Sequence, residues 1–355
     1  MGTWPTSAIQ RARSWGAARI AGIVALVVLA AACSSSPSPQ PQAAPQPLPP
    51  GLPLRAVGEV SLPGDNSRFD SASLDVDKGL LFISHIAENE VLEVDVNAQR
   101  VVRTIPNLTS VHGVLAVGAL NRVFASATRS RQVVAIDETT GAEIGRVPTG
   151  DYPTAITYDS QRHTVWVANE KGGTATVFDA DTLQPRGTPY LGADVGDLSY
   201  DPATDRILVA LPAANQLAVV DPAAMTVVTR VTLPECDSAH SVAADQQDRL
   251  VFVACAYNAH LITVDATNWT AVATDPVAQG PETLAYDAAA HRLYVAAESG
   301  ILTVAFVRDR KIQQTRAGFL ADDAHVVAVD PNTHRSFYPV HGGSEGPVLL
   351  IREAT

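Results

Sequence analysis

Three histidines and one glutamate are the residues of this chain whose types and spacing could do metal chemistry. His112, His240, Glu282 and His325 stand at nearly equivalent points of separate stretches, each just before a run of apolar residues. Imidazole and carboxylate groups are ligands of zinc, copper and manganese. If those stretches surround one axis, the four side chains could converge there and bind a divalent metal. The alternative is that they hydrogen-bond neighbouring loops or line a wet channel, because the chain has no HExxH or other short ligand motif.

The stretches that carry these residues are copies of one repeat. The phrase AYDAAAHRLYVAA, residues 285–297, has counterparts such as ITYDSQRHTVWVAN and LSYDPATDRILVAL. Each copy holds four short segments rich in apolar and β-branched residues, separated by Asp, Gly, Pro and Asn, which is typical of a propeller blade. The aspartates are predicted to cap turns at strand ends. A column of turn residues aligns the copies at intervals of 41–44 residues: Asp77, Gly118, Asp159, Asp201, Asp245, Asp287 and Asp330.

The two ends of the repeat region complete one another. The seventh copy stops at Thr355 after three strand-like segments, and the segment Leu54–Gly64 matches the fourth segment of other copies, such as Ala142–Gly150. Pairing them would remove the open edges that a partial blade exposes. The sequence therefore predicts an all-β, seven-bladed propeller over residues 54–355, whose last blade is closed by the N-terminal strand.

The candidate binding residues fall on one predicted face. In a propeller, the loops from the fourth strand to the next first strand, and from the second to the third, gather around the central channel, and such loops commonly carry binding residues. His163, His291 and His334 share a turn position on the opposite face, where we expect solvated side chains. The repeat register assigns to the binding face Asp70, His85, His112, Asp151, Asp194, His240, Glu282, His325 and His341.

The N-terminal region has the pattern of an export signal. Three arginines precede an uncharged apolar stretch, residues 20–32, which is too short for a relaxed membrane span. The stretch ends in Leu29-Ala30-Ala31-Ala32-Cys33, which resembles a bacterial lipobox. We predict a signal peptide over residues 1–32, a lipidated Cys33, and a Ser/Pro/Gln-rich spacer over 33–53 that holds the propeller off a membrane. The alternatives are a secretory signal cleaved after Ala32 and an uncleaved anchor.

Two cysteines remain beyond Cys33. An exported protein occupies an oxidising compartment, so a disulfide between Cys236 and Cys255 is reasonable. Antiparallel pairing across the turn at residues 245–249 would bring both cysteines to the same end of one hairpin. Two free thiols are the alternative. The chain has no Cys-x-x-Cys motif, which argues against thioredoxin-like chemistry.

The charge of the mature chain limits its partners. Residues 1–32 contain three arginines and no acidic residue, so their removal leaves 22 basic and 37 acidic residues, a formal charge of −15. Such a surface repels phosphate backbones, which disfavours nucleic acid as a partner. It disfavours anionic lipid headgroups as well, so the acyl chains on Cys33 would make the membrane contact.

Several segments resemble a known family. The segments TVWVANEKGGTATVFDADT (164–182), RFDSASLDVDKGLLFISH (68–85) and VHGVLAV (111–117) resemble the YVTN/YncE-like repeats of exported bacterial propellers. The resemblance implies a propeller in the cell envelope but no single activity, since related propellers include lactonases and lyases. We therefore predict a lipid-anchored module that binds an envelope protein, a glycan or a small ligand. The alternative is a metal-assisted hydrolase or lyase that uses the axial His/Glu cluster.

Overall fold

The computed structural model describes residues 51–342 and 346–355. The predicted signal peptide, Cys33 and the spacer up to residue 50 lie outside the described residues. Across the described part of the chain, no helix combines the length and the apolar character needed to cross a membrane. The helical segments there are four single 3-10 turns: η1 (Gly118–Leu120), η2 (Thr128–Ser130), η3 (Glu170–Gly172) and η4 (Pro212–Ala214).

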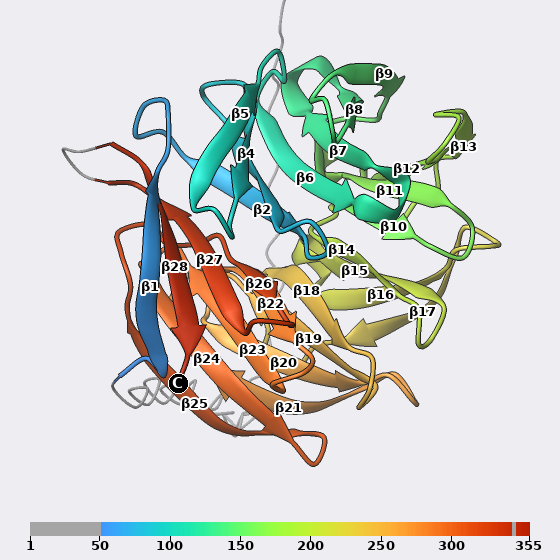
Figure 1. The fold of residues 1–355 in the computed structure, drawn as a ribbon. Helices are drawn as coiled ribbons and strands as arrows, with labels where there is room; N and C mark the ends of the chain where they lie inside the picture. The colour runs from blue at the N-terminus through green and yellow to red at the C-terminus, as the bar shows by residue number, and fades with distance from the viewer. Residues whose placement is uncertain (1–50, 343–345) are drawn as a thin grey trace, which may run out of the picture. The chain divides into compact units, whose positions relative to one another are not determined.

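The described residues form seven antiparallel sheets of four strands each. Figure 1 shows the sheets as successive blades around a common centre. Short β-branched and aromatic segments with a turn after nearly every one favour this arrangement, because each hairpin pairs with the next along the chain. The predicted all-β, seven-bladed propeller is confirmed.

Six blades use their strands in chain order from the inside outward, and the seventh takes its outermost strand from the beginning of the described chain. The first strands are β2 (Phe69–Asp75), β6 (Val111–Val117), β10 (Pro153–Asp159), β14 (Leu198–Asp201), β18 (Ala239–Asp245), β22 (Pro281–Asp287) and β26 (Ala328–Asp330). The second strands are β3 (Leu80–His85), β7 (Arg122–Ala127), β11 (Thr164–Asn169), β15 (Arg206–Leu211), β19 (Leu250–Cys255), β23 (Arg292–Ala297) and β27 (Arg335–Val340). The third strands are β4 (Glu90–Asp95), β8 (Gln132–Asp137), β12 (Thr174–Asp179), β16 (Gln216–Asp221), β20 (His260–Asp265), β24 (Ile301–Arg308) and β28 (Val348–Ala354). The fourth strands are β5 (Arg100–Ile105), β9 (Glu143–Pro148), β13 (Pro185–Gly187), β17 (Thr226–Thr232), β21 (Thr270–Pro276), β25 (Lys311–Phe319) and, in the seventh blade, β1 (Leu54–Ser61).

The first strands make the inner ring. Each contacts the first strand of the next blade, and the ring closes where β26 meets β2. The first strands therefore surround the axis, and side chains at their beginnings are the ones that can face it.

The seventh blade joins the two ends of the described chain. Strand β1 pairs antiparallel with β28, from Leu54 opposite Ala354 to Ser61 opposite Val348. In Figure 1, β1 (blue) lies beside β28 (red). The amide of Thr355 also donates to the carbonyl of Pro53 at 2.9 Å. This pairing covers an edge that would otherwise expose unpaired backbone groups, as the sequence predicts.

The hydrophobic core lies within and between the blades. The second and third strands are almost fully buried, whereas the fourth strands alternate between exposed and partly buried residues. One buried cluster joins Phe82 and Val91 of the first blade to Val123 and Val134 of the second. Because neighbouring blades share their apolar faces in this way, the ring is rigid enough to hold loops in place.

The turn column differs from the predicted one in the first two blades. Asp75, not Asp77, ends β2, and its Oδ1 accepts the amides of Asp77 and Lys78 at 3.0 and 3.3 Å. The equivalent residue of the second blade is Val117, so Gly118 lies one position later. A Cβ on Gly118 would come within 2.3 Å of Asp75 Oδ2. The predicted register was therefore shifted by two residues in the first blade and by one in the second.

Candidate functional site

A cavity of about 570 Å³ lies on the axis of the propeller. Six of the seven first strands line it within the described residues, namely all except β26. Volumes of this size are typical of small-molecule sites. We call the end of the propeller that carries this cavity and its loops the cavity end, and the opposite end, where the aspartate column lies, the turn end.

Bulges explain why side chains at strand starts face the axis. The pairing of first and second strands shifts register at the residues that carry Asp70, His112, His240 and Glu282. A bulge puts two residues of one strand opposite one of its partner and changes the direction of a side chain. The four residues stand five positions before the last residue of their strand, and all four line the cavity.

Five of the nine predicted binding-face residues line the axial cavity. They are Asp70, His112, Asp194, His240 and Glu282. Two further carboxylates join them, Glu170 and Asp197. The cavity wall thus carries five carboxylates against two imidazoles, which makes the wall acidic.

His240 lies among these carboxylates. Its Nε2 lies 4.0 Å from Glu282 Oε1, and its side chain keeps 34% of its accessible surface. Its buried Nδ1 has no hydrogen-bond partner. Burial by itself disfavours the imidazolium, but the negative charges of Glu282, Asp197, Asp70 and Glu170 outweigh burial and raise the pKa of His240.

Two carboxylates of the cavity wall have a raised pKa. Burial raises the pKa of Asp197 to about 6, although the neighbouring His240 opposes the shift. Burial, followed by the charge of Asp194, raises the pKa of Glu170. Burial therefore makes ionisation of these two carboxylates cost free energy, which the neighbouring His240 offsets only in part.

Arg68 holds one side of the cavity mouth. Its guanidinium lies 3.2 Å from Glu282, 3.1 Å from Glu298, 3.5 Å from Asp70 and 3.7 Å from Asp323. Burial disfavours its charge, but these four carboxylates raise its pKa. This contact joins the first blade to the sixth and neutralises part of the acidic wall.

Aromatic rings accompany the carboxylates at the cavity. His112 Nδ1 lies 2.8 Å from the carbonyl of Ser110, and its ring packs edge-on against Tyr152 at 5.4 Å. The ammonium of Lys171 stands 3.5 Å from the centre of the Tyr152 ring. Tyr257 also lines the cavity and is 77% exposed. Tyrosine faces attract cations, so the mouth has a second means of holding positive charge.

His325 does not join the axial group. Strand β26 begins only at Ala328, and Asp323 has a positive φ of 55°. The chain therefore turns before the strand, and His325 is 98% buried beneath it. Its Nδ1 and Nε2 lie 2.7 and 2.8 Å from the carbonyls of Asp323 and Phe69. Both ring nitrogens are thus engaged by backbone, so the structure does not bring the four predicted metal ligands together.

Three other predicted residues lie away from the cavity wall. Asp151 pairs with Arg131 at 2.9 Å on the surface. His341 follows β27, with its Nε2 3.7 Å from Asp323 Oδ2. His85 is fully buried at the end of β3 and contacts Ser67.

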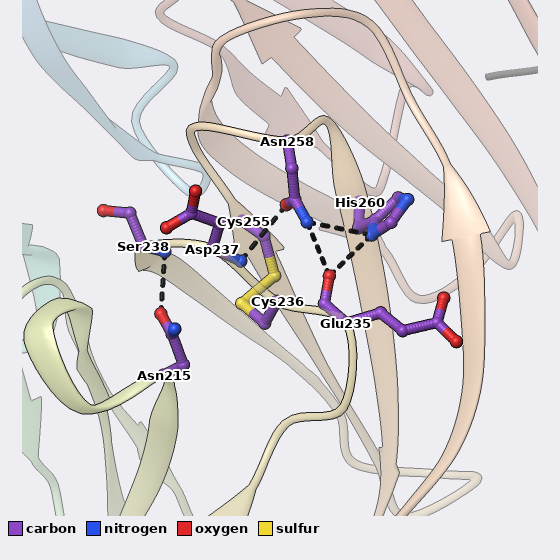
Figure 2. The surroundings of a disulfide bond; sticks show 8 residues. All are labelled: Asn215, Glu235, Cys236, Asp237, Ser238, Cys255, Asn258 and His260. Atoms are coloured by element: carbon purple, nitrogen blue, oxygen red, sulfur yellow. Dashed lines mark hydrogen bonds between the residues drawn. A yellow bond between two sulfur atoms is a disulfide. The ribbon is translucent and has the colours of Figure 1, made fainter. Parts of the chain in front are cut away.

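Cys236 and Cys255 form a disulfide at the cavity end of the fifth blade, with Cα atoms 5.4 Å apart. Figure 2 shows the loop of Cys236 joined to the end of β19 by the disulfide and to the following turn and the start of β20 by hydrogen bonds. Asn258 donates to the carbonyl of Glu235 at 2.6 Å, and His260 Nδ1 lies 2.7 Å from the same oxygen. The loop that leads into His240 is therefore fixed by a covalent bond and by side-chain hydrogen bonds.

Sequence reasoning missed Arg68, Asp197 and Tyr257. Asp197 had a detectable signal in the repeat. Four positions before the last residue of each first strand, Asp197 is the only ionisable residue among Ser71, Gly113, Ala155, Asp197, Ser241, Thr283 and Val326. It is preceded by Gly196, where a Cβ would lie 2.7 Å from the carbonyl of His240. The close approach of these two blades thus requires glycine at 196 and brings Asp197 towards His240.

The tightest set of potential metal ligands in the described residues is elsewhere. Asp245, Asp248 and His291 have ligand atoms within 4.8 Å of one another at the turn end. Asp245 Oδ1 already accepts two backbone amides, and its Oδ2 accepts the hydroxyl of Tyr286 at 2.5 Å. These oxygens are used by the protein itself, so this set has the chemistry of a turn.

Comparison with known proteins supports the architecture. No known family profile matches the chain, and no curated protein matches it. Among solved structures, it is similar to a chain of hydrazine synthase from Kuenenia stuttgartiensis, with 15% identity and a TM-score of 0.71. The match covers 81% of this chain and 95% of that chain. At this identity the likeness shows a shared propeller fold.

Proposed function

We propose that this protein is a lipid-anchored binding module of the bacterial cell envelope that takes a small, positively charged organic ligand in its axial cavity. The observation that carries the proposal is the excess of carboxylates over cations in a cavity of about 570 Å³. Five carboxylates face this space, and Arg68 neutralises only part of their charge through Glu282 and Asp70.

Electrostatics supports a cation as the ligand. Burial makes ionisation of Asp197 and Glu170 unfavourable, and a bound positive charge would relieve that cost. The exposed ring of Tyr257 at the mouth adds a surface that attracts ammonium groups.

Geometry supports an organic cation over a single metal ion. A metal ion needs several ligand atoms about 2–2.5 Å from one point. The five axial carboxylates are instead distributed over four blades, around a volume much larger than one ion. An amine with two or more charged nitrogens would contact several of them at once.

The anchor and the family resemblance belong to the same proposal. The Leu29–Cys33 motif and the uncharged spacer support lipidation at Cys33, and the YVTN/YncE-like repeats support an exported envelope protein. Expression of the full chain in a bacterial host with a radiolabelled fatty acid tests this part. We expect label on the wild type and none on Cys33→Ala; equal labelling would overturn the anchor.

Calorimetric titration of the full chain with spermidine in low-salt buffer at pH 7.5 tests the ligand class. We expect saturable binding that weakens as salt is added. The double variant Asp197→Asn/Glu282→Gln should lose at least about tenfold in affinity, or about 1.4 kcal/mol. Asp151→Asn is the matched control, because Asp151 is a carboxylate at the same end that does not line the cavity.

Parallel titrations with Zn²⁺ and Mn²⁺ address the metal-assisted hydrolase or lyase. Stoichiometric metal binding that His112→Ala and His240→Ala both abolish, without spermidine binding, would favour that alternative. Binding of none of the three probes would overturn the axial cavity as a cation site.

A further inference from the structure

We propose that Ser67 is a nucleophile, with His85 as its general base and Glu90 as the residue that orients His85. The three side chains lie at the cavity end of the first blade but outside the axial cavity. The proposal assigns to the protein a covalent reactivity towards activated esters and phosphonates that is independent of cation binding.

The order of contacts is that of a nucleophile, a base and an orienting acid. Ser67 Oγ lies 3.0 Å from His85 Nε2. On the other side of the ring, His85 Nδ1 lies 3.7 Å from Glu90 Oε1. His85 ends β3 and Glu90 begins β4, and the two residues are opposite each other in the sheet. The sheet therefore places the imidazole beside the Glu90 carboxylate, and the loop before β2 brings the Ser67 hydroxyl to the other ring nitrogen.

The buried ring nitrogen is the observation that points to this role. His85 is fully buried, and its Nδ1 has no hydrogen-bond partner although it faces Glu90. A 3.7 Å separation is too long for a hydrogen bond, but a small rotation of the Glu90 side chain would close it. Catalytic hydrogen bonds are often long in the absence of substrate. With the proton on Nδ1, Nε2 can accept the proton of Ser67, in competition with the Asp65 carboxylate, which also accepts from the Ser67 side chain and lies 3.8 Å from Nε2.

The surroundings of His85 keep it neutral and fix its plane. Burial lowers its pKa, against the charges of Asp65 and Glu88. Glu90 also faces the ring. Its own pKa is raised by burial and then by the charge of Glu88. Phe69 packs on the ring with centroids 4.6 Å apart. A neutral imidazole is the form that can take a proton, so the base is ready at neutral pH.

The reaction is a balanced acyl or phosphonyl transfer. Ser67 Oγ attacks the carbonyl carbon of an ester, its proton passes to His85 Nε2, and the C–O bond to the alcohol breaks. The proton on His85 then leaves with the alcohol, and an acyl-serine remains. With a fluorophosphonate the O–P bond forms, the P–F bond breaks, fluoride departs and the proton passes through His85 to water. Water acting by the reverse path would release the acid from an acyl-serine.

A fluorophosphonate probe tests the proposal on the full chain. We expect a covalent adduct on Ser67 by peptide mass spectrometry, no adduct at that position in Ser67→Ala, and labelling about 100-fold slower in His85→Gln. Ser130→Ala is the matched control. Ser130 is a loop serine of the same end whose hydroxyl donates to a backbone carbonyl, and labelling should be unchanged.

The pH profile separates catalysis from a structural role and needs no variant of the buried histidine. The labelling rate of the wild type should rise with pH and then level off. The midpoint of this rise should lie below pH 6.5, because burial lowers the pKa of His85. Glu90→Gln removes a negative charge from Nδ1, so it should slow labelling and move the midpoint to lower pH. Absence of the Ser67 adduct, or a rate without a midpoint below 6.5, would overturn the proposal.

Discussion

The two ends of this propeller use aspartate in opposite ways. At the turn end, Asp159 and Asp287 are fully buried, and Oδ1 of each accepts two backbone amides of the following turn. At the cavity end, Asp70 and Asp197 line the axial cavity and have side-chain partners in place of backbone amides: Asp70 lies 3.5 Å from Arg68, and Asp197 interacts with Ser241 and His240. The difference teaches that neighbours decide the role: where backbone donors surround a carboxylate it is part of the fold, and where they are missing it is available to a ligand.

The pKa directions of four carboxylates show the same division, whereas burial raises the pKa of Glu138 at the turn end to about 7. Turn-end carboxylates held by fixed donors are stabilised as anions: the hydrogen bonds of Thr140 lower the pKa of Asp137, and the Arg186 guanidinium lowers that of Asp179. In the cavity, burial raises the pKa of Asp197 and of Glu170. The cavity thus holds two carboxylates whose ionisation burial disfavours and whose charge the neighbouring His240 compensates only in part.

Opening the ring should have the largest effect on the free energy of unfolding, because the cavity end and the turn end both depend on its closure. Deletion of residues 54–61 removes β1 and exposes the edge of β28. We expect a loss of more than about 4 kcal/mol in the free energy of unfolding, or loss of the folded state. Thermal unfolding followed by circular dichroism measures it. A deletion within the spacer, residues 34–50, should leave the transition in place, and equal effects would contradict the closure.

Removing the disulfide should come next and act at the cavity end. The double variant Cys236→Ser/Cys255→Ser releases a loop closed over a separation of 19 residues. We expect a loss of about 3 kcal/mol, because the cross-link restricts the unfolded chain. Denaturant titration measures the loss. Dithiothreitol should destabilise the wild type by the same amount and leave the variant unchanged.

Replacing a turn aspartate should lower the free energy of unfolding more than replacing a cavity aspartate. Asp159→Ala leaves the amides of Gln161 and Arg162 without their acceptor. We expect a loss of about 2 kcal/mol. The matched variant Asp194→Ala, at the cavity end, should change the free energy of unfolding by less than about 0.5 kcal/mol. Similar losses in both variants would contradict the division between the two ends.

The smallest expected effect is an increase in the free energy of unfolding when Asp197 in the cavity is replaced by asparagine. The folded-state pKa of Asp197 is raised to about 6 from an ordinary value of 3.8. The folded state therefore binds the proton more tightly, and stability falls as pH rises from about 4 to 6. Asp197→Asn should raise the free energy of unfolding by about 1–2 kcal/mol at pH 7.5, after allowance for solvent screening, and hardly at pH 4. Denaturant titrations at both pH values test this; an equal change at both would contradict it.

The architecture was predictable because its signals are local and repeated. Turn residues and alternating apolar segments recur in each copy, so an error in one copy does not alter the whole. The exact turn residue of a single blade was harder to predict. Asp75 and Asp77 are two positions apart, so both fit the alternating pattern of the strand. Only the hydrogen bonds from the amides of Asp77 and Lys78 identify Asp75 as the residue that caps the turn.

The cavity wall was predictable only in part. Asp70, His112, His240 and Glu282 share one position of the repeat, and the bulges at their strand starts bring all four to the axis. His325 has the same sequence position but packs against the carbonyl of Phe69, 256 residues away. No local pattern contains that contact.

By itself, the sequence determined the number of blades, the strands of each blade and the joining of the two ends, because hairpin pairing is short-range chemistry repeated at a constant interval. Only the tertiary structure decided which ionisable side chains share the cavity and which imidazole lies between Ser67 and Glu90. Those relations join residues from different blades or across a strand pair, so they depend on bulges, buried backbone groups and close approaches that exist only once the ring has closed.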